Sequence, residues 1–307
     1  MSGAPATLDL PSPLPRSATV PEREGLLAGL SQGWQSWRQR WVCMGPDCSE
    51  RYGLRAWCKL PARVQLQEGW CCSQECFQSA LEVQAHRLLH EAVPRAVRQH
   101  RFPLGLLLLS QGRITQTQLR AALQEQQQRG GRVGEWLVRR GAVPETDVAA
   151  TVALQWACPT FPLAESHVWQ QLRGWVPLPL LRTLGMLPLY FAPAQRKLYV
   201  GFTQTLDFNV LAALGQMLEC ATEACIVTDS AWAAALEQLR SAPGAASESV
   251  ELEDMDGALD IAGVVRQYAR YAEARHVRLA AIGPFLWVRI RGRRTLHLTF
   301  RTARPRS

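Results

Sequence analysis

The sequence has very little lysine: Lys59 and Lys197 are the only two among its 34 basic residues. Neither follows a glycine, so the Gly-Lys-Ser/Thr signature of a phosphate-binding P-loop is missing. No nucleophile elbow or other catalytic signature occurs, and the scattered serines and histidines form no recognisable triad. We therefore expect a protein that is not an enzyme and, in particular, not an ATPase.

Long apolar runs are also scarce. The run at Leu104–Leu109 is far shorter than the roughly 20 apolar residues that a membrane-spanning helix needs. The first residues lack the basic segment and apolar stretch of a secretory signal. We therefore expect a cytoplasmic location without a transmembrane segment. In that compartment thiols stay reduced, and clustered cysteines are more often metal ligands than disulfides.

The net charge of +8 comes almost entirely from arginine. An arginine bias suits phosphate binding, because the planar guanidinium donates two hydrogen bonds at once, but a GC-rich genome produces the same bias. A basic balance favours anionic partners without choosing among a nucleotide, a nucleic acid and an acidic protein. A nucleic-acid-binding function would leave the repeat described below unexplained, so we do not expect a nucleic-acid partner.

Composition along the 307 residues predicts an α+β protein built from several small modules. The predicted order is a disordered segment, 1–24; a cysteine-rich, zinc-ribbon-like module with a helix, 25–100; a helical twin-repeat followed by a small α/β part, 101–240; a polar linker, 241–257; and a module of one helix and antiparallel strands, 258–307. The α/β part should have a β-β-α-β-α order. In the last module, Leu286, Val288 and Ile290 alternate with Arg289 and Arg291, which predicts a strand with one buried face and its arginines in solvent.

Six of the nine cysteines lie between Cys43 and Cys76. Zinc binds four thiolates tetrahedrally, and two short Cys-containing turns are the usual way to supply them. Such a closed site is structural and not catalytic. The two closely spaced pairs predict a structural zinc site whose ligands are Cys43, Cys48, Cys72 and Cys76. Two alternatives remain: Cys58 or Cys71 replaces one ligand, or the cysteines are reduced and buried as small apolar side chains.

The segment Gly69–Phe77 resembles the second knuckle of treble-clef-like zinc ribbons, in which a Cys-Ser-x-x-Cys turn opens a helix. Cys71 stands where those ribbons have an aromatic residue. The remaining cysteines, Cys158, Cys220 and Cys225, lie in apolar stretches and are predicted to be core residues.

A 24-residue pattern occurs twice, at Pro103–Gln126 and Arg132–Gln155, with five residues between the copies. Both copies have Gly at the third and tenth positions, Leu at the sixth, a branched aliphatic at the twelfth and Gln at the last. Each predicts a short helix closed by a glycine, then a second helix that begins near Thr115 or Pro144. Helices this short are not stable alone, so the copies must pack on each other.

This repeat resembles the N-terminal domain of type II secretion and type IV pilus assembly ATPases, in its MshE-like form, over residues 101–240. In that family two motifs of this length and spacing bind cyclic di-GMP, and each begins Arg-Leu-Gly. The second copy keeps Arg132 and Gly134, whereas the first has Pro103 in place of the Arg, with Arg101 two residues before it. The family's ATPases carry a motor domain, and the missing P-loop predicts that this chain lacks it.

The resemblance implies a cyclic di-GMP site formed by both copies. Arg132 would stack on or clamp the ligand, glycines would let the backbone approach it, and glutamines would contact guanine or order the loops. Aliphatic residues would press against its apolar faces. The implied residues are Arg101, Leu104, Gly105, Leu108, Gly112, Leu123, Gln126, Arg132, Gly134, Leu137, Gly141 and Gln155.

Together these patterns predict a non-enzymatic, cytoplasmic protein that binds cyclic di-GMP and acts as a regulator or adaptor of secretion or pilus-assembly machinery. Ligand binding would change how the flanking modules dock on a protein of that machinery. The alternative is a protein-interaction scaffold that keeps the same fold and the structural zinc site but binds no nucleotide.

Overall fold

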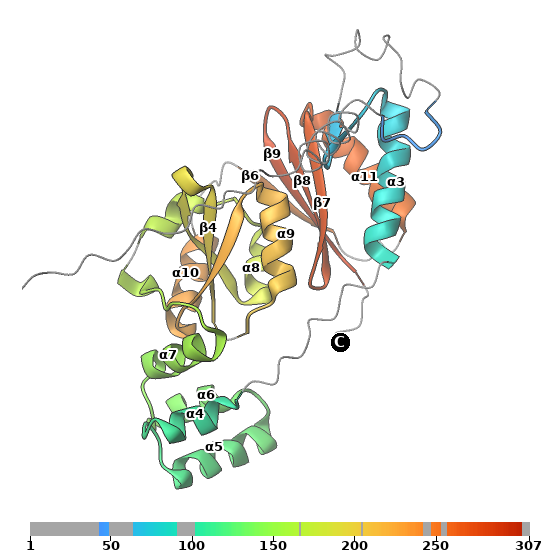
Figure 1. Cartoon of the computed structure of the whole chain (residues 1–307). Coiled ribbons are helices and arrows are strands. Elements are labelled where there is room, and N and C mark those ends of the chain that lie inside the picture. The colour runs from blue at the N-terminus through green and yellow to red at the C-terminus, as the bar shows by residue number, and fades with distance from the viewer. Residues whose placement is uncertain are drawn as a thin grey trace, which may run out of the picture. The chain divides into compact units, whose positions relative to one another are not determined.

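The computed structural model describes residues 43–48, 64–90, 102–165, 167–203, 205–241, 247–252 and 257–302, and it has the predicted α+β fold (Figure 1). The predictions for residues 1–24, Cys58 and Arg101 fall outside these ranges. Within them, no helix is both long enough and apolar enough to cross a lipid bilayer.

The larger sheet joins strands that precede the twin repeat with strands that follow it. Its order is β2 (Gly69–Cys71), β1 (Val64–Leu66), β7 (His276–Ile282), β8 (Phe285–Arg291), β9 (Thr295–Arg301) and β6 (Ser247–Leu252). As predicted, β7, β8 and β9 are antiparallel neighbours. β1 adds in parallel to β7, and β6, which lies within the acidic segment 241–257, adds in parallel to β9.

Two helices cover one face of this sheet. α3 (Gln74–His90) and α11 (Ala258–Tyr271) pack on each other and share an apolar core with alternate residues of the strands. α11 contributes Ile261 and Val265, which lie one helical turn apart, and the strands contribute Leu279 and Val288. The cysteine-rich segment and the C-terminal segment therefore form one core.

The opposite face of the same sheet is buried as well. Its apolar residues belong to a second core, shared with the twin repeat and the α/β part: Ala280, Ile282, Phe285 and Trp287. Trp287 is 0% exposed. Arg289 donates a hydrogen bond to the Met217 carbonyl, at 2.9 Å. The expectation that the arginine face lies in solvent is therefore wrong for Arg289, because alternation separates two faces without showing what covers the polar one.

The twin repeat folds as two copies of a helix pair. The first copy is α4 (Leu104–Ser110) and α5 (Gln116–Arg129), and the second is α6 (Val133–Arg139) and α7 (Glu145–Trp156). Gly112 and Gly141 follow the first helices with φ of 67° and 64°, as predicted for glycines that end a helix. Thr115 caps α5 and exchanges hydrogen bonds with Gln118 in a capping box.

The α/β part has the predicted β-β-α-β-α order after a short helix. Its elements are α8 (Leu178–Leu184), β3 (Met186–Ala192), β4 (Lys197–Phe202), α9 (Phe208–Leu218), β5 (Ala221–Ile226) and α10 (Asp229–Ser241). β3 and β4 are antiparallel, whereas β5 is parallel to β4 and needs α9 as its crossover. α9 presents Val210, Leu214 and Met217 at helical spacing to the second core.

Arginines attach the C-terminal end of α9 to the larger sheet. Arg278 Nη1 donates to the Gln216 carbonyl at 3.0 Å, as Arg289 does to Met217. Arg278 also pairs with the Glu219 carboxylate. The last carbonyls of a helix lack intrahelical donors and carry partial negative charge. Two guanidinium groups therefore satisfy this helix end where it is buried.

Candidate metal centre and twin-repeat site

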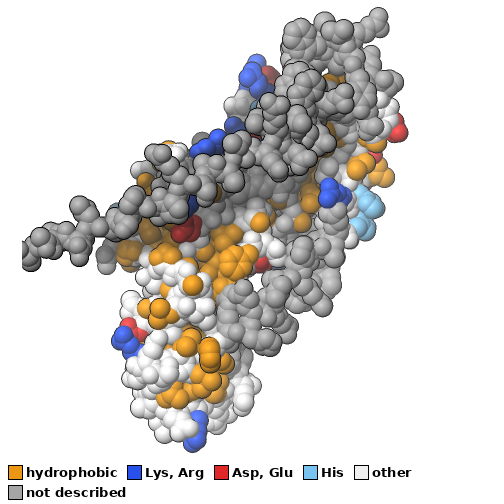
Figure 2. Space-filling model, in the orientation of Figure 1, with side chains coloured by type: hydrophobic (Ala, Val, Ile, Leu, Met, Phe, Trp, Pro, Cys, Tyr) orange, Lys and Arg blue, Asp and Glu red, His pale blue; other side chains and the backbone are white. Residues whose placement is uncertain are grey.

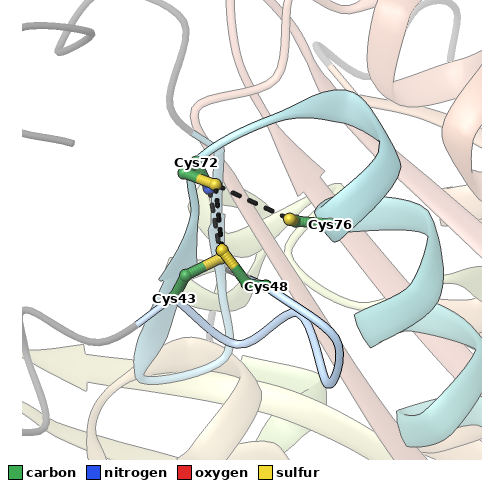
Figure 3. A group of neighbouring side chains, drawn as sticks. All are labelled: Cys43, Cys48, Cys72 and Cys76. Atoms are coloured by element: carbon green, nitrogen blue, oxygen red, sulfur yellow. Dashed lines mark hydrogen bonds between the residues drawn. The ribbon is translucent and has the colours of Figure 1, made fainter. Parts of the chain in front are cut away.

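Four cysteine side chains converge beside the N-terminal end of α3 (Figure 3). Cys43 and Cys48 bound one turn, Cys72 follows β2, and Cys76 lies in the first turn of α3. Their Sγ atoms all lie within 4.8 Å of one another. The structure thus brings together all four cysteines that the sequence predicts to be metal ligands.

The spacing of these sulfurs fits one tetrahedral ion. Cys72 Sγ lies 3.5 Å from Cys48 Sγ and 3.6 Å from Cys76 Sγ. Four thiolates bound at about 2.3 Å to zinc have sulfurs roughly 3.8 Å apart. A disulfide instead needs about 2.05 Å, and these cysteines are free thiols. The four cysteines and the spacing of their sulfurs therefore fit a four-thiolate metal site.

Backbone groups from both halves of the cluster point at one sulfur. The N–H groups of Gly45 and Cys72 each approach Cys43 Sγ at 3.4 Å. Cys43 is buried, so a thiolate there needs a nearby cation, and a soft-ligand metal supplies one.

The first turn of α3 shapes the fourth ligand. Ser73 Oγ accepts a hydrogen bond from the Cys76 N–H at 3.1 Å and caps the helix. Burial raises the pKa of the Cys76 thiol, but hydrogen bonds with Ser73 and Cys72 outweigh burial and hold that pKa below its ordinary value. A Cβ at Gly45 would lie 2.8 Å from Cys76 Cβ. The turn between Cys43 and Cys48 therefore closes over the helix start only because it carries a glycine there.

Cys71, one of the alternative ligands, belongs to the apolar core with Phe77 and Leu81. Burial raises the pKa of the Cys71 thiol, which opposes the thiolate form that a metal needs. Among the described residues, the metal cluster does not include Cys158 or Cys225. Burial raises the pKa of Cys225 to about 11, as suits a core thiol.

The two repeats pack reciprocally. α4 packs on α7 and α5 on α6, so the first helix of each copy meets the second helix of the other, and α4 meets α6 between them. A Cβ at Gly105 would lie 2.4 Å from Leu119 Cδ1, and one at Gly134 would lie 3.1 Å from Val148 Cγ1. Leu119 and Val148 occupy the same position of their repeats. The motif glycines therefore let helices approach closely in both copies.

The last residue of each repeat makes an equivalent contact. Gln126 Nε2 donates to the Gly131 carbonyl at 3.0 Å, and Gln155 Nε2 donates to the Phe102 carbonyl at 2.6 Å. Gly131 and Phe102 immediately precede the second and the first repeat. Each glutamine thus holds the segment that leads into the first helix of a repeat. Reciprocal helix packing and these paired contacts relate the copies by an approximate twofold axis.

Arg132 stands at the surface where the second repeat begins. It is the N-cap residue of α6, and its side chain is 48% exposed. Its Nη2 atom lies 3.3 Å from Asp229 Oδ1 and 3.2 Å from Asp229 Oδ2. No local pattern points to Asp229 as the partner of Arg132, because it lies 97 residues further along the chain. The equivalent residue of the first repeat, Pro103, is exposed and has no side-chain donor.

The predicted ligand residues within the described part of the chain differ in solvent exposure. Gly105, Leu108, Gly134 and Leu137 are buried; Leu104, Gln126 and Gln155 are half-buried; Gly112, Leu123, Arg132 and Gly141 are exposed. A ligand at the surface would touch the last two groups, and the buried group would act through packing. Phe102, Leu106 and Leu154 are exposed apolar residues of the same region, and Figure 2 shows apolar side chains on the surface over the twin repeat.

Comparison with known proteins gives matches among solved structures only. No protein-family model matches the chain, and no curated protein matches it. A structure of MshE with cdg is 25% identical, with a TM-score of 0.39, and the match covers 45% of this chain and 99% of that one. A structure of the N-terminal domain of XpsE is 17% identical, with a TM-score of 0.34, and the match covers 46% of this chain and 98% of that one. Each of these structural matches covers nearly all of the matched chain and about half of this one.

Proposed function

We propose that this chain is a non-enzymatic, cytoplasmic protein that binds cyclic di-GMP and acts as a regulator or adaptor of secretion or pilus-assembly machinery. The observation that carries the proposal is the reciprocal arrangement of two 24-residue repeats that resemble the family's ligand motifs. An approximate twofold axis between equivalent segments suits a dinucleotide with internal twofold symmetry. Binding would alter how the modules flanking the repeat dock on a protein of that machinery.

Arg132 is the residue on which binding would depend most. Its guanidinium is planar and donates two parallel hydrogen bonds, so it matches a phosphate group, and its face stacks on a purine base. It lies at an exposed helix start, while Gln126 holds the preceding segment through Gly131. The exposed Leu123 offers an apolar contact to a base. Gly105 and Gly134 would support the site by setting the helix spacing.

Zinc would serve this protein as a structural ion. Four thiolates leave no open coordination position, so the site would hold the turn at residues 43–48, β2 and α3 together and would activate no water. Metal analysis of the purified chain should give one zinc per molecule. Cys48→Ser should reduce this content, whereas Cys158→Ser, outside the cluster, should not. Equal zinc content in both variants would contradict the ligand assignment.

The receptor proposal is tested by calorimetric titration with cyclic di-GMP. Arg132→Ala should abolish binding or weaken it at least tenfold. Arg140→Ala is the matched control, because Arg140 lies at the other end of α6, is 46% exposed and pairs with Glu125. Both variants remove one arginine from an exposed ion pair, so they lower the net charge equally. A folded, zinc-loaded wild type that shows no heat and no thermal shift would refute the receptor proposal.

A second candidate function is a nucleotide-free interaction scaffold. It is favoured by contacts that explain the repeat without a ligand: Leu119 fills the space beside Gly105, and Gln126 and Gln155 bond to backbone carbonyls. The exposed apolar residues of the repeat would then contact a protein. Under this function, cyclic di-GMP neither binds nor stabilises the fold. The zinc content expected of wild type, Cys48→Ser and Cys158→Ser stays the same.

A further inference from the structure

The starts of three helices meet beside the second repeat. Arg132 precedes α6, Glu145 begins α7, and Asp229 and Ser230 begin α10. Arg132 contacts both carboxylate oxygens of Asp229. The Ser230 N–H donates to Glu145 Oε1 at 2.8 Å, and the Ser230 hydroxyl donates to Glu145 Oε2. Two carboxylates on different helices therefore lie at the place where the proposed ligand would meet its arginine.

These two carboxylates have different environments. Glu145 accepts hydrogen bonds from the Ser230 N–H and hydroxyl at the start of α10, where the helix dipole favours negative charge on Glu145 and on Asp229 alike. Asp229 instead faces Arg132, and their side chains are 35% and 48% exposed. An ion pair this exposed is weak and screened by salt. A second anion can therefore displace Asp229 from the guanidinium at small cost.

We infer that Asp229 competes internally for Arg132 and so sets the affinity of the site for its anionic ligand. This inference rests on the proposed function, in which Arg132 holds a phosphate group of cyclic di-GMP. The phosphate and the Asp229 carboxylate need the same donors of one guanidinium, so binding breaks the ion pair. The displaced carboxylate then lies near the negative charge of the ligand. Both effects weaken binding, and both depend on the charge of Asp229.

The contact that remains after displacement keeps α10 in place. Glu145 and Ser230 join α7 to α10 without Arg132. Neutralising Asp229 therefore removes the competitor and leaves the two hydrogen bonds between Glu145 and Ser230 in place. Asp229→Asn is the suitable change, because it removes the charge and keeps the shape of the side chain.

The test compares cyclic di-GMP affinities of the full chain by calorimetry at low salt. Asp229→Asn should bind roughly threefold to tenfold more tightly than wild type, as expected when an exposed charge pair and a nearby like charge are removed. Glu237→Gln is the control, because Glu237 lies on the same helix, is exposed and pairs with Arg240. It removes the same charge and should change affinity less than about twofold, as a surface charge away from the site should. At about 0.5 M salt the advantage of Asp229→Asn should shrink.

The outcomes separate this inference from the function on which it rests. Unchanged or weaker binding by Asp229→Asn, at an unchanged melting temperature, overturns the competition while the receptor stands. Equal tightening by Glu237→Gln also overturns it, because the effect is then one of net charge. Absence of binding by wild type and Asp229→Asn alike overturns the receptor and the competition together. Asp229→Ser, which keeps a residue suited to a helix start, replaces Asp229→Asn if the latter does not fold.

Discussion

Replacing Gly105 with alanine tests whether the motif glycines are needed for helix packing or for contact with a ligand. The added Cβ would lie 2.4 Å from Leu119 Cδ1. Leu119 is only 7% exposed, so its side chain would have to shift among packed neighbours and not into solvent. Forcing one extra carbon into a packed site costs about 1–3 kcal/mol. Alanine has a higher helix propensity than glycine, which offsets up to about 1 kcal/mol of this cost and less at the second residue of α4. The free energy of unfolding should therefore fall by roughly 1–2 kcal/mol.

Gly263 provides the matched control. It lies inside α11, and a Cβ there would meet nothing within 4 Å. Gly263→Ala should therefore stabilise the chain by about 0.5–1 kcal/mol through helix propensity alone. The same substitution thus has opposite signs at the two positions, and the sign depends on what lies beside the glycine.

Differential scanning calorimetry measures both effects. One kcal/mol shifts the melting temperature by about 2–4 °C in domains of 150–250 residues, so Gly105→Ala should melt a few degrees below wild type and Gly263→Ala slightly above. Cyclic di-GMP titration of both variants completes the assay. A Gly105→Ala variant with unchanged or raised melting temperature that no longer binds ligand would refute the packing argument, because the glycine would then serve ligand approach.

Further predictions concern the metal, the buried histidine and two polar contacts. Removing the metal with a strong chelator should lower the melting temperature of wild type, and Cys48→Ser should already melt lower and respond less to the chelator. Burial and a nearby arginine lower the pKa of His297 from 6.5 to about 4. Because the folded state holds His297 neutral while the unfolded state protonates it below about pH 6.5, the free energy of unfolding falls by up to about 3 kcal/mol as the pH is lowered from about 6.5 to about 4. Urea unfolding of His297→Gln should show a smaller dependence on pH over this range. Glu219→Gln should lower the free energy of unfolding measured in urea by about 1–3 kcal/mol, because it removes one carboxylate from the buried Arg278; an unchanged urea midpoint would show that the Gln216 carbonyl and the Glu68 carboxylate suffice as its partners. Gln155→Ala should cost about 1 kcal/mol through the lost bond to Phe102, and retention of the wild-type urea midpoint would argue against the reciprocal contact.

Local spacing in the sequence was enough to predict the metal cluster. Cys43 and Cys48 bound a turn of fixed length, and Cys72 and Cys76 lie on either side of a helix start. Such short segments have few conformations, so their residue types largely decide where the side chains point. The assignment of Cys71 needed the structure, because neighbouring residues of a strand face opposite sides and the sequence does not show which side is the core.

The repeat was predictable in its elements but not in its contacts. Gly112 and Gly141 require a positive φ, which marks both helix ends in the sequence. The partner of Arg132, by contrast, is an aspartate 97 residues away. The burial of Arg289 on β8 was missed for the same reason, because the residue that accepts its hydrogen bond, Met217, belongs to α9.

The sequence by itself thus determined the α+β composition, the four-cysteine cluster, the two helix pairs and the β-β-α-β-α order, since each depends on residues close together in the chain. Only the tertiary structure decided that β1 pairs with β7, joining Gln65 to His276, and that α10 supplies the carboxylate opposite Arg132. Contacts of this kind depend on how completed elements bury their remaining apolar faces against one another. Which elements pack on one another depends on the whole chain, so these contacts produce no periodic pattern in any one segment of the sequence.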